Sequence, residues 1–211
     1  MDFAHSVLGF TLTAAVVTLT PGLDMVLVLR QSLRGRRSVA FATAAGICLG
    51  ALLWGVGAAA GLAALFVASQ AAYNVLRYAG VAYLLWLGWG YLRSAWRGDG
   101  LGDIAELPVE DVGMAAAFGK GLLTDLLNPK MAIFYLTLLP LFLPAGYQPV
   151  LVGTLLAGIH AVMAMLWFTV VILSAHALKR FLTHGRGAQV VDGVAGTAMI
   201  AFGAGLALEH H

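Results

Sequence analysis

Long runs of apolar residues, separated by short charged or turn-rich segments, dominate the chain. There are six of them, at residues 3–29, 39–68, 72–92, 113–139, 150–175 and 188–207. Each run reaches the roughly 20 residues that an α-helix needs to cross the hydrocarbon layer of a bilayer. The pattern therefore predicts an all-α integral membrane protein with six transmembrane helices.

The composition points the same way. Of the 211 residues, 61% are hydrophobic and only 10% are charged, whereas a soluble domain has roughly 45–50% apolar and about 25% charged residues. So few charges cannot cover a surface in water, and we expect the chain to be in contact with membrane lipid. Cys48 is the single cysteine, which excludes an internal disulfide or a cysteine metal cluster, and we expect no cofactor or bound metal.

Basic residues are concentrated in alternate connections between the runs. The first, third and fifth connections hold Arg30, Arg34, Arg36 and Arg37, then Arg93 and Arg97, then Lys179, Arg180 and Arg186. Because short cytoplasmic loops accumulate Lys and Arg, both termini are expected outside. Because most basic residues lie in these separate connections, they form no patch for nucleic acid. The first run has no basic leader, so we interpret it as a retained helix rather than a signal peptide.

The chain divides into two halves of three predicted helices. The halves are residues 1–92 and 113–207, joined by an acidic cytoplasmic linker at 93–112, and residues 208–211 resemble the remnant of an expression tag. Three is an odd number, so the halves must be inserted in opposite orientations. In each half a proline interrupts the first helix, Pro21 in one and Pro129 in the other. Matching breaks of this kind are typical of inverted-repeat transporters.

Both breaks carry polar residues. Proline removes a backbone donor and obstructs the carbonyl four residues earlier, which releases polar groups that lipid cannot satisfy. The broken segments are Thr20, Pro21 and Gly22 in the first half and Asn128, Pro129 and Lys130 in the second. Asp24 and Asp125 lie three and four residues from the respective prolines, so each is on roughly the same helical face as its break. Freed helix ends and carboxylates predict an internal cavity suited to a zwitterion such as an amino acid.

Simpler explanations exist for the same residues. An ionised side chain in hydrocarbon costs at least about 2.5–3.5 kcal/mol on insertion scales, which favours a functional interior site. Asp24 and Asp125 could instead form an interhelical ion pair or cap a broken helix. Lys130 could neutralise either aspartate or bind the carboxylate of a substrate. The prolines could be packing kinks, and His160 is more typical of a packing residue than of a proton relay.

The second predicted helix carries a stripe of glycines. Its members are Gly46, Gly50, Gly57 and Gly61. Their spacing predicts a smooth face for close helix packing and leaves a homodimer open. Trp54 and Tyr135 lie well inside their runs, and we expect them to pack in the core rather than line a substrate path.

Several segments together resemble the LysE/RhtB family of amino-acid exporters, and the RhtB branch most closely. Residues 20–25 (TPGLDM), followed by 29–31 (LRQ) and a basic loop, resemble the amino-terminal signature of that family. Gly121, the triplet at 128–130 (NPK) and residues 139–142 (LPLF) resemble its second signature, and residues 83–88 (YLLWLG) its third-helix pattern. The chain departs from the family at Leu23, where a second proline is usual, and at Met131, which replaces a smaller residue and would narrow a cavity.

The resemblance implies a protein of the bacterial inner membrane that exports amino acids or their derivatives, in exchange for protons. On this hypothesis Asp24 or Asp125 meets the substrate ammonium, Lys130 or a half-helix N-terminus meets its carboxylate, and a proton competes for one carboxylate. Asn128 and Thr20 would line the same site. The chain would be a transporter and not an enzyme.

Two alternatives belong to other classes. Two membrane aspartates could form an intramembrane aspartyl protease, but neither lies in the Gly-x-Gly-Asp pattern expected of one. A metal-ion or other small-ion exporter would need several clustered oxygen ligands, and two aspartates beside a lysine are a poor set for a hard cation.

Overall fold

A computed structural model describes residues 2–20, 22–33, 36–68, 70–97 and 112–177, with short stretches between 189 and 204. Within these residues all the regular structure is helical. The helices are α1 (Phe3–Leu19), α2 (Leu23–Leu33), α3 (Arg37–Ala68), α4 (Gln70–Arg97), α6 (Met114–Leu126), α7 (Pro129–Ile133) and α8 (Pro149–Leu173). After α7 the chain continues as a π-helical turn, Phe134–Leu138, and a 3₁₀ turn, Leu139–Phe142. The prediction of an all-α protein is confirmed.

The breaks predicted in the first and fourth apolar runs are present. The axes of α1 and α2 differ by 53°, and α6 is bent by 52° from the segment Pro129–Phe142. Pro21 itself lies outside the described residues, whereas Pro129 is the first residue of α7 and Asn128 is its N-cap. Proline fits the first helical turn because its missing N–H would have no partner there. At the second break, α6 therefore ends at Leu126 and α7 begins at Pro129.

Two described helical spans, Arg37–Gly61 and Pro149–Leu173, are long and apolar enough to cross a membrane, and there are up to four if each bent pair is one span. Much of the predicted sixth run, 188–207, and most of the linker at 93–112 lie outside the described residues. Gly88 of α4 does lie against Gly196 and Ile200 of the C-terminal segment. The arrangement of six spans remains a prediction.

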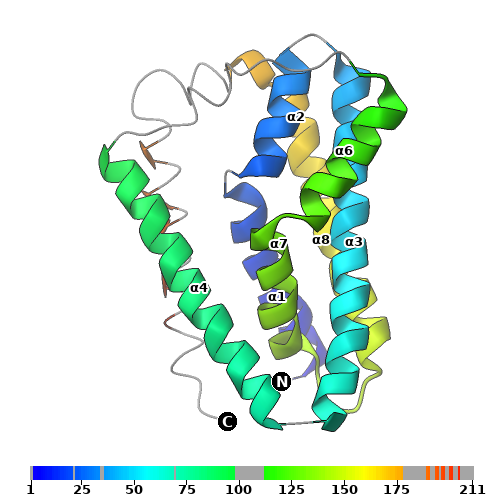
Figure 1. Ribbon diagram of the computed structural model, residues 1–211, viewed down its shortest axis with the longest axis vertical. Helices are drawn as coiled ribbons and strands as arrows, with labels where there is room; N and C mark the ends of the chain where they lie inside the picture. Colours follow the sequence, from blue (N-terminus) through cyan, green and yellow to red (C-terminus); the bar gives the residue numbers. More distant parts are fainter. Residues whose placement is uncertain are drawn as a thin grey trace.

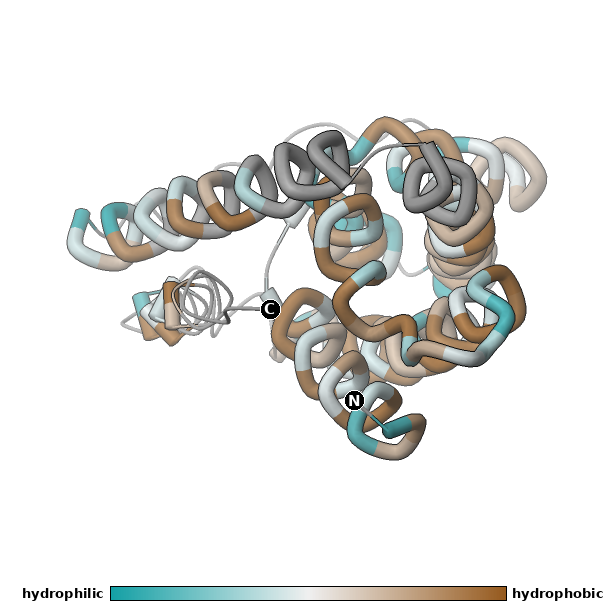
Figure 2. Tube along the Cα trace, turned by 90° about the horizontal axis from the view of Figure 1, so that it is seen from below, coloured by the Kyte–Doolittle hydropathy of each residue, from teal (hydrophilic) through white to brown (hydrophobic). Residues whose placement is uncertain are grey.

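The broken helices stand end to end inside a bundle (Figure 1). α1 lies below α2 and α7 lies below α6, while α3 runs the length of the bundle and packs on α6 and α8. α4 leans away from the other helices and contacts the π-helical turn Phe134–Leu138. Seen along the bundle, apolar segments recur on helices all around it (Figure 2). Leu8 and Leu12 of α1 and Leu151 and Leu166 of α8 are exposed, as expected of helices that face lipid.

Glycines set the distance between α3 and α6. A Cβ on Gly46 would clash with the Phe118 carbonyl oxygen, and a Cβ on Gly121 would clash with that of Thr43. Backbone therefore lies directly on backbone, as the small-residue stripe predicted. The second half of the stripe makes no such contact, because among the described residues a Cβ on Gly57 or Gly61 would meet nothing within 4 Å. The close contact is confined to the part of α3 that faces the second break.

Candidate functional site

At the first break, a lysine from the other half of the chain donates hydrogen bonds to two backbone carbonyl groups. Proline has no N–H, so Pro21 cannot donate to the carbonyl of Val17 four residues earlier. Lys130 Nζ donates to this Val17 oxygen at 3.3 Å and to the Thr20 carbonyl oxygen at 3.2 Å. The C-terminal end of a helix carries partial negative charge, so a cation is favourable there. The Thr20 hydroxyl donates to the Val16 carbonyl, and the contact of Thr20 with Lys130 is made through the backbone oxygen.

At the second break, a tryptophan of α3 donates a hydrogen bond to a backbone carbonyl group. Pro129 cannot donate to the carbonyl of Asp125, again four residues earlier. Trp54 Nε1 donates to this oxygen at 3.3 Å, and the Asn128 N–H donates to it at 3.0 Å. The Asn128 side chain caps α7, because its Oδ1 accepts from the Lys130 N–H at 3.0 Å. Both carbonyls released by proline thus have replacement donors.

The two breaks are joined to each other through Asn128 and Lys130. Asn128 Nδ2 donates to Asp24 Oδ2 at 2.7 Å, which ties the second break to the first turn of α2. A Cβ on Gly22 would lie 3.1 Å from Lys130 Nζ, so a side chain at this position would crowd the ammonium. The structure therefore brings together the predicted residues of both halves.

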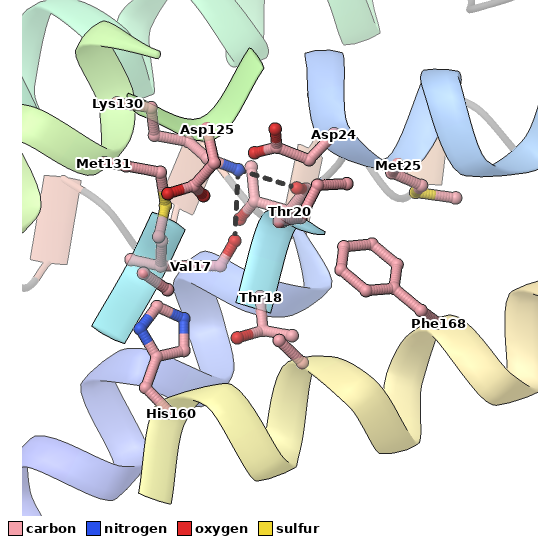
Figure 3. Close-up of a pocket in the computed structure, with 13 residues that line it drawn as sticks. Val17, Thr18, Thr20, Asp24, Met25, Asp125, Lys130, Met131, His160 and Phe168 are labelled. Atoms are coloured by element: carbon pink, nitrogen blue, oxygen red, sulfur yellow. Dashed lines mark hydrogen bonds between the residues drawn. The ribbon is translucent and has the colours of Figure 1, made fainter. Parts of the chain in front are cut away.

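A small cavity lies between the breaks (Figure 3). Its polar wall includes Thr20, Asp24, Asp125 and Lys130, and its apolar wall includes Met25, Ile47, Met131 and Phe168. Its volume is about 30 Å³, enough for about two or three water molecules, each of which needs roughly 10–15 Å³ by this measure. An amino acid needs more space than this, and we refer to the cavity in this narrow form as closed. Met131 lines the cavity, and its narrowing effect compared with a smaller residue stays a prediction.

The carboxylates of this cavity are buried, and their partners differ. Asp24 is 7% exposed and Asp125 is 0% exposed. Asp24 Oδ2 has its bond from Asn128, whereas Asp24 Oδ1 and both carboxylate oxygens of Asp125 have no hydrogen-bond partner among the described residues. Within the described part of the chain Lys130 forms no ion pair with either aspartate. Its ammonium binds carbonyl oxygens instead, so neither ion pair that the sequence suggested for Lys130 is seen.

Four functional neighbours had no clear signal in the sequence. Trp54 packs against the apolar core, as expected, and its indole N–H also donates to the Asp125 carbonyl at the second break. His160 also lines the cavity, and its Nδ1 lies 2.8 Å from the buried Tyr135 hydroxyl. Gly50 packs on Asp125, because a Cβ there would lie 2.6 Å from Asp125 Oδ2. The available signal was a polar or very small residue within an apolar run, which is too common in this chain to select these positions.

The fold and the site together define a class of protein. It is an all-helical membrane protein in which two helix breaks enclose a buried, ionisable cavity, an arrangement typical of secondary transporters. The chain belongs to the LysE type translocator family, which it matches over residues 15–210. The resemblance inferred from the signature segments is therefore confirmed, and the family is one of transport proteins rather than enzymes.

Several relatives align with almost the whole chain. The putative amino-acid transporter YggA of Aeromonas salmonicida is 32% identical, with 98% of this chain and 95% of that protein aligned. The threonine efflux protein of Escherichia coli K12 is 31% identical, with 89% and 90% aligned. The homoserine/homoserine lactone efflux protein of Salmonella typhimurium is 27% identical, with 96% of each chain aligned. No solved structure matches the chain.

The family match also bears on the alternatives. Both aspartates line one cavity with room for water, which is the geometry that a protease would require, so geometry alone does not separate the two classes. Membership of a translocator family does. For a metal exporter, the described residues contain no group of three or more His, Cys, Asp or Glu side chains that could hold an ion.

Proposed function

We propose that this protein exports amino acids or their derivatives from the cytoplasm across the bacterial inner membrane. The proposal is supported by its family and by relatives named as efflux proteins for threonine and for homoserine and its lactone. The observation that carries it is the cavity between the two breaks, where two carboxylates and one lysine lie within a membrane bundle. Such a set offers both charges that a zwitterion requires.

Binding requires the closed cavity to open. The substrate ammonium would approach a carboxylate of the cavity, Asp24 or Asp125. Its carboxylate would take the Lys130 ammonium, which must then exchange the carbonyl oxygens of Val17 and Thr20 for the substrate. A proton and an ammonium are alternative occupants of one carboxylate, so their competition would couple efflux to proton entry. Alternating opening of the cavity to the two sides would complete an antiport cycle.

We further propose that the chain has six spans, arranged as two inverted three-helix repeats, 1–92 and 113–207, with both termini outside. Support comes from the end-to-end pairs α1–α2 and α6–α7 and from the distribution of basic residues. Arg36 and Arg37 at the start of α3 and Arg97 at the end of α4 lie at one end of the bundle, while α1 begins at the other (Figure 1). A homodimer is compatible with this arrangement.

Counterflow in proteoliposomes tests the function. Vesicles that hold the protein are loaded with one unlabelled amino acid, and entry of the labelled form is followed with and without a proton gradient. We expect accelerated exchange for a subset that includes threonine or homoserine, and a response to the gradient. Protein-free vesicles set the baseline. The absence of exchange for every amino acid, from correctly folded protein, would refute the proposal.

A further inference from the structure

We propose that Asp125, and not Asp24, is the carboxylate that exchanges a proton for the substrate ammonium, and that Asp24 is a positioning residue held by Asn128. This inference rests on the proposed function and names the group that would couple efflux to protons. The two aspartates face the same cavity, so the distinction must come from their hydrogen bonds.

The hydrogen bonds are unequal. Asp24 Oδ2 accepts from Asn128 Nδ2 at 2.7 Å, a contact that stabilises an ionised carboxylate. Both oxygens of Asp125 are buried and have no hydrogen-bond partner in the described part of the chain, and the residue is 0% exposed. A buried carboxylate without a partner is costly if charged, and a bound proton removes the charge. The closed cavity is therefore consistent with an ionised Asp24 and a protonated Asp125.

The other ionisable groups around Asp125 are already engaged. They are Asp24 on α2, Cys48 on α3, Lys130 on α7, Tyr135 on the π-helical turn and His160 on α8. Lys130 binds two carbonyl oxygens, Cys48 Sγ donates to the Ala161 carbonyl, and Tyr135 pairs with His160. Of these described groups, only Asp125 has a side chain with no partner, so it is the one open to a new cation.

The packing of α3 keeps the Asp125 carboxylate without a hydrogen-bond donor. Gly50 offers no side-chain donor to Asp125, and an added Cβ would lie 2.6 Å from Oδ2. Trp54 donates to the Asp125 backbone oxygen and not to its carboxylate. The helix thus fixes the Asp125 backbone while it leaves the carboxylate free for a proton in the closed state and for an ammonium in the open one.

Infrared spectroscopy of the substrate-free protein tests where the proton lies. A protonated carboxyl group has a C=O stretching band that a carboxylate lacks. We expect this band in the wild type near neutral pH, its loss in Asp125→Asn and its retention in Asp24→Asn. Asp125→Glu should restore a band at a shifted frequency, which controls for misfolding of the asparagine variant. Absence of the band in the wild type, or its loss in Asp24→Asn alone, would overturn the inference.

Adding substrate tests the exchange itself. Threonine, homoserine and leucine are added in turn to wild type and to Asp24→Asn, and the Asp125 band should diminish as protons enter the solution. If counterflow occurs but no transported amino acid changes the band, the inference is wrong. If the band belongs to Asp125 but no amino acid is exchanged, the failure is that of the proposed function. The two failures are thus distinguishable.

Discussion

Side-chain donors take the place of the N–H groups that proline lacks. Lys130 supplies one for Val17 and Thr20, and Trp54 supplies the other for Asp125. An unsatisfied carbonyl in a membrane interior costs more than one at a wet surface, because no solvent donor is near. Each donor therefore holds a broken helix in a defined geometry.

Replacing Trp54 by Phe removes the indole N–H while most of the aromatic surface remains. We expect the free energy of unfolding to fall by about 1 kcal/mol, the usual effect of one neutral hydrogen bond, with some further loss from the smaller ring. Thermal unfolding in detergent measures the change. Benzothienylalanine at the same position keeps the bicyclic ring without an N–H, so it should reproduce most of the loss.

Trp96→Phe is the matched control for this prediction. Trp96 is 71% exposed and lies near the end of α4, so the same substitution there should change stability little. Equal effects at the two positions, or an unchanged stability with benzothienylalanine at position 54, would contradict a role for the Trp54 hydrogen bond.

The sequence was sufficient to find the two aspartates and the lysine of the cavity but not their partners. Pro21, Asp24, Asp125 and Pro129 stand out because charge and proline are rare in apolar helices. The bond between Asn128 and Asp24 spans 104 residues, and nothing local to either residue encodes it. Trp54 was interpreted as core for the same reason: its donor role depends on a proline in another helix.

Among the described helices, α3 and α6 pack with their backbones in direct contact. Gly46 and Gly121 each lie on the backbone of the opposite helix. This contact positions α6, and with it Asp125, against Gly50. The spacing of the glycines predicted this close contact but not how far it extends along α3. Among the described residues, a Cβ on Gly57 or Gly61 would meet nothing within 4 Å. The π-helical and 3₁₀ turns that follow α7 had no signal in the apolar pattern.

Gly121→Ala should therefore destabilise the protein strongly. The new methyl group would clash with the Thr43 carbonyl, and overpacking of this kind costs about 1–3 kcal/mol. Gly119→Ala on the same helix is the matched control, because a Cβ there meets nothing within 4 Å. Alanine is a better helix former than glycine by up to about 1 kcal/mol, so the control should be neutral or stabilising. Equal decreases in the melting temperatures of Gly121→Ala and Gly119→Ala in detergent would argue against close packing of α3 on α6 at Gly121.

At the scale of the whole molecule, the distribution of basic residues predicts one orientation in the membrane. The connection between α2 and α3 should face the cytoplasm, and the connection before α8 should face outward. Ser38 and Ala145 are exposed near these two connections, while the native Cys48 is buried. With a membrane-impermeant maleimide on intact cells, we expect Ala145→Cys to be labelled and Ser38→Cys to be protected.

Permeabilised cells supply the control, because both introduced cysteines should then react and the unmodified chain should not. Labelling of Ser38→Cys in intact cells with protection of Ala145→Cys would reverse the orientation. Labelling of both in intact cells would rule out opposite sides for these connections.

The lysine that closes the first break is synthesised 110 residues after Thr20. During synthesis the first half therefore enters the membrane with the carbonyls of Val17 and Thr20 open and with Asp24 lacking its amide donor. No described residue of that half makes either contact in the finished fold, so we expect the insertion machinery to shelter a polar gap until residues 128–130 arrive. A chain interrupted before that point would present this gap to lipid, and membrane quality-control proteases would find it there.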